Sequence, residues 1–226
     1  MDTRAVEARL TDIPRGEVLK YLGYRGQNID SNLERQIEGC IQAVRTCAKP
    51  RLTYRIVPIV NGSPEGLVLE GSDIAALLEG CLKAIVMAAT LGPEAEALLR
   101  RTEITNMADA VIMDSAQSAA IENVCDNFES DLRLHFRSEN LYLTDRYSPG
   151  YGDLDLSSQS PISEFLVAEK RIGLTVTKNL IMVPRKSVTC IIGVSDSPRK
   201  LMRRGCESCR ASKTCQYRES GRYCNA

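Results

Sequence analysis

The chain has 226 residues, with 29 Lys or Arg and 29 Asp or Glu, so its formal net charge at pH 7 is zero. Nucleic-acid binding usually needs a basic excess, so this balance predicts no nucleic-acid partner. The sequence has no apolar run of about 20 residues and no basic segment ahead of an apolar one, which predicts a cytoplasmic protein with no membrane partner. Tryptophan is absent and aromatic residues make up 5% of the chain, so an aliphatic core is expected.

Hydrophobic spacing and turn residues predict a mixture of helices and strands. Residues 31–47 carry apolar side chains at helical spacing, and residues 52–57 alternate as a strand does. The unbroken apolar run at 83–91 is typical of a buried central strand. Helices are expected at residues 15–22, 31–47, 73–82, 94–103, 106–136 and 162–171. Strands are expected at residues 4–10, 52–57, 67–69, 83–91 and 140–144, followed by a final hairpin of 181–183 and 187–194.

These elements show no regular repeat of strand, helix and strand. The order therefore predicts an α+β fold, with a mostly antiparallel sheet flanked by helices. We expect residues 1–196 to form this domain and residues 197–226 to form a separate Cys-rich tail. His135, the only histidine, falls at the end of the longest helix, where it is expected to interact with the helix dipole rather than with a ligand.

Residues 145–153, here termed the motif loop, combine turn residues with groups that recognise ligands. Pro149 fixes its own backbone, and Gly150 lets a ligand approach the main chain. Arg146 offers a planar fork for a carboxylate, and Tyr147 and Tyr151 flank the Pro-Gly pair. Two interpretations follow. The loop is either an ordinary surface turn or a site for a small anionic, partly aromatic ligand.

Cysteines fall into two groups. Five occur singly in apolar surroundings and are expected to be small buried thiols: Cys40, Cys47, Cys81, Cys125 and Cys190. Four gather in the tail as Cys206-x2-Cys209-x5-Cys215-x8-Cys224. Clustering in a cytosolic protein favours a metal, either zinc or an iron–sulfur cluster, over free thiols or redox disulfides. Zinc would make the tail structural or a docking element, whereas a cluster would make it an entry point for electrons.

Three segments resemble motifs of one known family. Arg146-x-x-x-Gly150-Tyr151 is similar to the R-x-x-x-G-Y motif of the reactivation domain of cobalamin-dependent methionine synthase. The segments 172–177 (IGLTVT) and 182–189 (MVPRKSVT) are similar to two further motifs of that domain, in the same order. The chain departs from the family at Lys178-Asn179, where an acidic residue and Ser are usual.

The resemblance implies a curved sheet with the motif loop on its concave side, and a site for S-adenosylmethionine. Arg146 would pair with the ligand carboxylate, Gly150 would allow close backbone approach, and Tyr151 would line the adenosyl or methionyl part. Main-chain groups of Tyr147 and Ser148 would bond to the adenine or the amino group. The segment 182–187 would support the loop. No residue is expected to act as a catalytic acid, base or nucleophile.

The predicted function is that of a stand-alone reactivation protein, which supports reductive methylation of cob(II)alamin on a cobalamin-dependent methionine synthase. A flavodoxin- or ferredoxin-like partner would donate the electron. Because no cobalamin-binding D-x-H-x-x-G motif occurs, the cobalamin is expected on the partner, and the chain alone is expected to be inactive. Two alternatives stay open. One is a zinc or iron–sulfur module that docks a corrinoid protein, and the other is S-adenosylmethionine binding for a different corrinoid methyltransferase.

Overall fold

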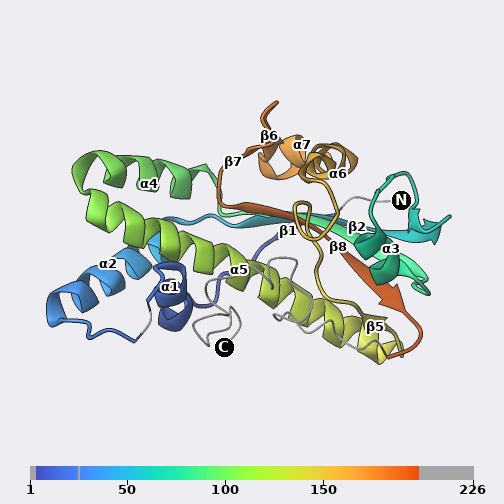
Figure 1. The fold of residues 1–226 in the computed structure, drawn as a ribbon, viewed down its shortest axis with the longest axis horizontal. Helices are drawn as coiled ribbons and strands as arrows, with labels where there is room; N and C mark the ends of the chain where they lie inside the picture. The colour runs from blue at the N-terminus through green and yellow to red at the C-terminus, as the bar shows by residue number, and fades with distance from the viewer. Residues whose placement is uncertain (1–3, 25, 199–226) are drawn as a thin grey trace.

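The computed structural model describes residues 4–24 and 26–198, and its centre is an antiparallel sheet. The strands of the sheet are β1 (Arg4–Glu7), β2 (Arg51–Val60), β4 (Lys83–Thr90), β5 (Tyr142–Leu143) and β8 (Ser187–Ser195). They lie in the order β1-β2-β4-β8-β5, with every neighbouring pair antiparallel (Figure 1). A two-residue strand, β3 (Ser63–Pro64), also pairs with β2. The α+β class with a mostly antiparallel sheet is confirmed.

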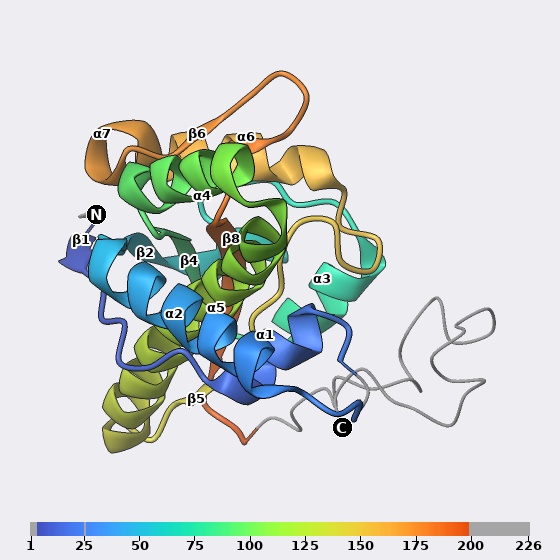
Figure 2. The same cartoon turned by 90° about the vertical axis from the view of Figure 1, so that its left-hand side faces the viewer.

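Four helices cover one face of the sheet. They are α1 (Arg15–Tyr21), α2 (Ser31–Cys47), α4 (Pro93–Thr105) and α5 (Met107–Ser138). The helix α5 lies along the sheet, and α1, α2 and α4 pack against it (Figures 1 and 2). Small buried residues such as Ala116, Ala119 and Ala120 let α5 approach its neighbours closely. None of the described helices is long and apolar enough to cross a membrane.

A second layer covers the opposite face. It contains α3 (Ser72–Leu78), the short 3-10 helix η1 (Leu156–Ser158), α6 (Gln159–Phe165) and α7 (Ala168–Ile172). A small sheet of β6 (Thr175–Val176) and β7 (Met182–Val183) follows α7. Figures 1 and 2 show α6 and α7 across the main sheet from α5. The main sheet is therefore enclosed between two helical layers.

The strand β4 explains why the sheet needs both layers. Its residues Ile85 and Met87 belong to the core beneath α5, while Ala84 and Val86 belong to the core beneath α3, α6 and α7. A strand buried on both faces is expected to read as one continuous apolar run, as this one does. The prediction of a buried central strand at residues 83–91 is confirmed.

Three predicted elements were wrong. Residues 67–69 form no strand, because Leu67 turns into the second core while Val68 is exposed, and only Ser63–Pro64 returns along β2. The helix expected at 162–171 is broken at Val167, whose φ is 52°, and continues as α7. The final hairpin does not form: β7 pairs with β6, whereas β8 pairs with β4 over eight residues. Pairing with the long strand β4 buries more of β8 than pairing with the two-residue strand β7 would.

Candidate ligand-binding site

The motif loop leaves the short edge strand β5 and crosses to the second helical layer. Tyr147 forms an isolated bridge with Ile191 of β8, through N–O distances of 2.9 and 2.8 Å. The loop then turns at Gly150, whose φ is 89° and whose N–H donates to the Leu154 carbonyl at 2.8 Å. The prediction that residues 145–153 are neither helix nor regular strand is confirmed. The backbone N–H and C=O of Tyr147 are already paired.

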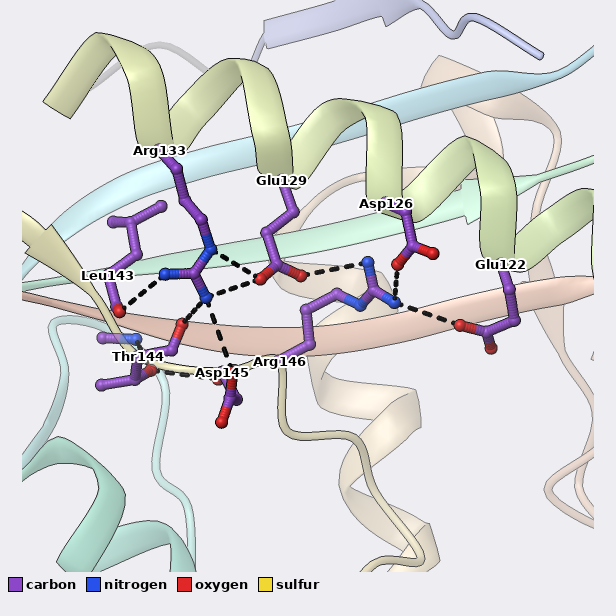
Figure 3. Close-up of polar contacts among 9 residues, drawn as sticks. Glu122, Asp126, Glu129, Arg133, Leu143, Thr144, Asp145 and Arg146 are labelled. Atoms are coloured by element: carbon purple, nitrogen blue, oxygen red, sulfur yellow. Dashed lines mark hydrogen bonds and ion pairs between the residues drawn. The ribbon is translucent and has the colours of Figure 1, made fainter. Parts of the chain in front are cut away.

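Arg146 points from this loop onto α5 (Figure 3). Its side chain is only 5% exposed. One guanidinium nitrogen, Nη2, donates to Glu122 at 3.1 Å and to Asp126 at 2.6 Å. The other, Nη1, lies 3.1 Å from Glu129 Oε2 as an ion pair, and it has no hydrogen-bond partner among the residues that the structure describes. The three carboxylates stand on successive turns of α5, so one helix face presents them all to the arginine.

Glu129 is held in place by a second arginine. Arg133 donates to Glu129 Oε1 from Nε at 2.9 Å and from Nη2 at 2.6 Å. It also donates to the carbonyls of Leu143 and Thr144, at 3.0 and 2.8 Å, and so ties α5 to the end of β5 (Figure 3). Glu122 and Asp126 have no such support, and their side chains are 42% and 64% exposed. They are the exposed partners of Arg146, and the ones that a ligand carboxylate could reach.

We use the term Arg146 cluster for Arg146, Arg133 and their four carboxylates, Glu122, Asp126, Glu129 and Asp145. With two arginines against four acids, the cluster has an acidic excess. Burial acts to lower the pKa of Arg146, but the neighbouring thiols and carboxylates raise it by more, so the pKa lies above its ordinary value. Arg146 is therefore cationic at any physiological pH.

Two buried thiols lie near the arginine. Burial raises the pKa of Cys125 to about 12 and raises the pKa of Cys190 well above its ordinary value. Both thiols are therefore protonated at neutral pH, and a protonated, buried thiol is a poor nucleophile. The prediction of buried thiols holds for Cys40, Cys81, Cys125 and Cys190, whereas Cys47 is half-buried.

Tyr21 lies near enough to Glu122, Asp126 and Tyr151 for their charges to act on its hydroxyl. Tyr151, in the motif loop, is largely exposed, and Tyr21, at the end of α1, is half-exposed. Partial burial raises the pKa of Tyr21 to about 12, with further contributions from Glu122, Glu17, Tyr151 and Asp126. Tyr21 therefore stays a neutral hydroxyl beside the exposed carboxylates. Nothing in a short helix near the N-terminus indicates that Tyr21 lies near Tyr151, which follows 130 residues later.

The predicted site residues thus meet different outcomes. Arg146 contacts three acids of α5 that were not singled out from the sequence, whereas Gly150 and Tyr151 lie further along the motif loop, where their N–H groups donate to the Leu154 and Ser148 carbonyls. Tyr147 points elsewhere, because its hydroxyl bonds to Asp73 and to the Tyr151 carbonyl, at 3.3 and 3.1 Å. The Ser148 carbonyl accepts from the Tyr151 N–H at 3.1 Å. Their predicted ligand contacts stay predictions.

Metal binding was predicted for the tail. Residues Cys206, Cys209, Cys215 and Cys224 lie outside the described residues. Within residues 4–24 and 26–198, no group of three or more His, Cys, Asp or Glu side chains is arranged to hold a metal ion. His135 lies in the last turn of α5, 3.6 Å from Glu139, which agrees with a surface residue at a helix end.

These observations define an α+β domain with an antiparallel sheet between two helical layers and a charged site at the β5 edge. Comparison with protein-family models and with curated proteins finds no match. Among solved structures, the chain is similar to the crystal structure of the MetH reactivation domain bound to AdoHcy, with a TM-score of 0.63 and 15% identity. The match covers 88% of this chain and 80% of the other. The chain has a reactivation-domain fold, as its three motifs implied.

Proposed function

We propose that this chain binds S-adenosylmethionine at the Arg146 cluster and supports reductive methylation of cob(II)alamin on a cobalamin-dependent methionine synthase. The observation that carries the proposal is the placement of Arg146. It is buried and fixed, yet two of its three carboxylate partners are exposed. The similar MetH domain was crystallised with AdoHcy, the product of methyl donation, which supports the choice of ligand.

The cluster suits the amino-acid head group of this ligand. The ligand carboxylate would replace Asp126 or Glu122 on Arg146 Nη2, which exchanges one charge-assisted hydrogen bond for another. The displaced acid would then accept from the ligand ammonium, so neither charge would be left unpaired. The acidic excess of the cluster also favours a ligand with a positive sulfonium.

The rest of the motif loop suits the nucleoside. The exposed ring of Tyr151 offers a flat surface on which a purine can stack. Gly150 has no side chain to keep a ligand from the backbone, and a Cβ there would press on Leu156 Cδ1 at 3.3 Å. Tyr21 would close the opposite side of the ligand and offer a hydroxyl.

The chemistry requires orientation rather than an acid or base. One electron from a flavodoxin- or ferredoxin-like donor, together with the methyl group of S-adenosylmethionine, converts cob(II)alamin to methylcobalamin and releases S-adenosylhomocysteine. The role of this chain is to hold the methyl donor in one geometry against a cofactor carried by the partner. The exposed position of Tyr151 and of these two carboxylates fits a ligand that is presented outward.

The proposal is tested by calorimetric titration of S-adenosylmethionine into the wild type and Arg146→Lys. Lysine keeps the charge but loses the planar fork, so the affinity should fall about tenfold or more. The matched control is Arg185→Ala: the segment 182–187 was expected to support the motif loop, but the Arg185 side chain pairs with two acids of α4, Glu96 and Glu103. Its affinity should equal that of the wild type. A folded wild type that does not bind, or an Arg146→Lys variant that binds equally well, would contradict the proposal.

The client is tested separately. The chain, S-adenosylmethionine and a reduced flavodoxin or ferredoxin are added to a cobalamin-dependent methionine synthase in its cob(II)alamin state. The absorption spectrum should change to that of methylcobalamin only when all components are present. If Arg146→Lys supports the change at the wild-type rate, the site described here is not the one that supplies the methyl group.

A further inference from the structure

The N-terminus of α3 is capped by the motif loop. Its own N-cap residue is Gly71, which has no side chain to accept from the first N–H groups. Asp153, at the end of the motif loop, accepts from the Ser72 N–H at 2.6 Å and from the Asp73 N–H at 3.0 Å. It also accepts from the Ser72 hydroxyl. A cap of this kind is normally supplied by the residue just before the helix, and here it comes from 80 residues further along the chain.

The contact is reciprocal. Asp73 Oδ2 accepts from the backbone N–H of Asp153 at 3.2 Å and from the hydroxyl of Tyr147 at 3.3 Å. Tyr147 is in turn paired with Ile191 through its backbone, so it is fixed to the sheet. We name the hydrogen bonds of Asp73 and Asp153 that join α3 to the motif loop the loop–α3 bridge.

The bridge leaves no space for a side chain at Gly152 unless Tyr147 or Asp73 moves. Gly152 has a φ of 51°, and a Cβ added to it would lie 2.0 Å from Tyr147 Oη and 2.1 Å from Asp73 Oδ2. The chain between the two fixed points, Tyr147 and Asp153, contains Gly150 and Tyr151. Fixing both ends of so short a segment restricts the positions that Tyr151 can take.

We propose that Asp153 and Asp73 are positioning residues for the ligand site, through the loop–α3 bridge, although neither contacts the ligand. The inference rests on the proposed function. Arg146 is held by α5, whereas Tyr151 and the Gly150 backbone are held by the bridge. The bridge therefore fixes the nucleoside half of the site relative to the amino-acid half. A loop ordered in the free protein loses less entropy on binding, so the bridge raises affinity by preorganisation.

A purely structural role for the bridge makes a different prediction. If Asp153 only capped α3, its loss would lower stability and leave the affinity of the folded protein unchanged. The residue Asp155 allows this comparison, because it makes a similar cap two residues later. Its Oδ1 accepts from the Ser157 N–H at 2.8 Å, within η1, and it does not join the motif loop to α3.

The test measures S-adenosylmethionine affinity by calorimetry and amide hydrogen exchange of residues 147–153 in four variants. Asp153→Ala and Asp73→Ala should each weaken binding about tenfold and speed exchange in the loop. Asp73→Asn keeps an acceptor oxygen and should retain most of the affinity. Asp155→Ala should bind as the wild type does. If Asp153→Ala does not fold, Asp153→Asn replaces it, with a smaller loss in the same direction.

Two results would overturn the inference. One is wild-type affinity in a folded Asp153→Ala, and the other is loop exchange that Asp153→Ala does not accelerate beyond Asp155→Ala. Failure of the proposed function would look different, because the wild type itself would not bind S-adenosylmethionine. Hydrogen exchange without ligand would then still decide whether the bridge orders the loop.

Discussion

Two clusters in this molecule pair arginine with carboxylates, but they bury opposite partners. Arg185, in the turn before β8, is 44% exposed and donates to Glu96, which is 9% exposed, through its backbone N–H at 2.9 Å and its Nε at 3.0 Å. In the Arg146 cluster the arginine is the buried partner and two of the acids are exposed. Only the second arrangement allows a ligand carboxylate to replace a protein carboxylate.

The difference follows from which group the fold holds fixed. Glu96 accepts from Arg185 and, at 3.2 Å, from Arg100, so it fastens the turn before β8 to α4. Exchanging Glu96 would leave the backbone N–H of Arg185 in this turn without its partner. Among the residues that the structure describes, Glu122 and Asp126 bond through their side chains only to Arg146, and water can solvate either one when it turns away. An exposed acid on a buried arginine is therefore the feature by which the proposed binding site differs from the Arg185 contact.

The largest expected effect comes from removing each arginine in turn. Arg146→Ala leaves Glu129 short of a partner and opens space under the loop, so it should cost about 3 kcal/mol of unfolding free energy. Arg185→Ala removes a half-exposed partner and should cost about 1.5 kcal/mol. Urea unfolding of both variants measures the difference. Equal costs would show that burial of the arginine does not distinguish the two clusters.

The next largest effect concerns the loop beside the Arg146 cluster. Gly152→Ala adds a Cβ at a positive φ where Tyr147 and Asp73 leave no space, so it should cost about 2 kcal/mol. Gly16→Ala, in α1 with no atom within 4 Å of the added Cβ, is the matched control and should not destabilise. A Gly152→Ala variant as stable as the wild type would mean that the loop is adjustable.

The unfolding free energy, measured over a pH series, tests whether Glu96 is the fixed partner of Arg185. Burial acts to raise its pKa, but hydrogen bonds from Arg185 and Arg100 lower it by more, so the pKa lies below its ordinary 4.5. The stability that ionised Glu96 contributes to the folded state is thus present above pH 4.5 and is lost as the pH falls through the folded-state pKa. Glu96→Gln should cost about 1.5 kcal/mol at pH 7, and the difference from the wild type should shrink below pH 4.5. A difference that does not change with pH would contradict this.

The smallest effect is expected at a pair in which neither partner is buried. Arg9 lies 3.3 Å from Asp131, and both side chains are exposed. Asp131→Ala should change the unfolding free energy by less than about 1 kcal/mol, and the change should vanish in high salt. A larger loss would mean that exposure is a poor guide to the energetics of these clusters.

Sequence patterns identified most of the fold. The helix at 31–47 and the strand at 83–91 agree with α2 and β4, because each depends on an apolar pattern that extends over two or more turns or a full strand. The final hairpin was wrong because the pairing of β8 is decided by the distant strand β4, which local turn residues do not reveal. Pairing across 100 residues is a property of the packed core.

The residues of the candidate site also differ in whether a local sequence pattern reveals them. Arg146, Gly150 and Tyr151 could be proposed from the sequence because they lie within six residues of one another, in a recognisable motif. Glu122 and Asp126 were missed, since two acids on a long helix read as a solvated face until a loop is placed against them. Asp73 and Asp153 were missed for the same reason, because each completes a contact whose other half is 80 residues away.

The central claim is that a ligand carboxylate replaces an exposed acid on Arg146. A crystal structure of this chain with S-adenosylhomocysteine tests it directly. We expect the ligand carboxylate at about 3 Å from the Arg146 guanidinium, with Glu122 or Asp126 turned toward the ligand ammonium. A bound ligand with Arg146 still held by both acids, or a ligand bound away from the motif loop, would contradict the account.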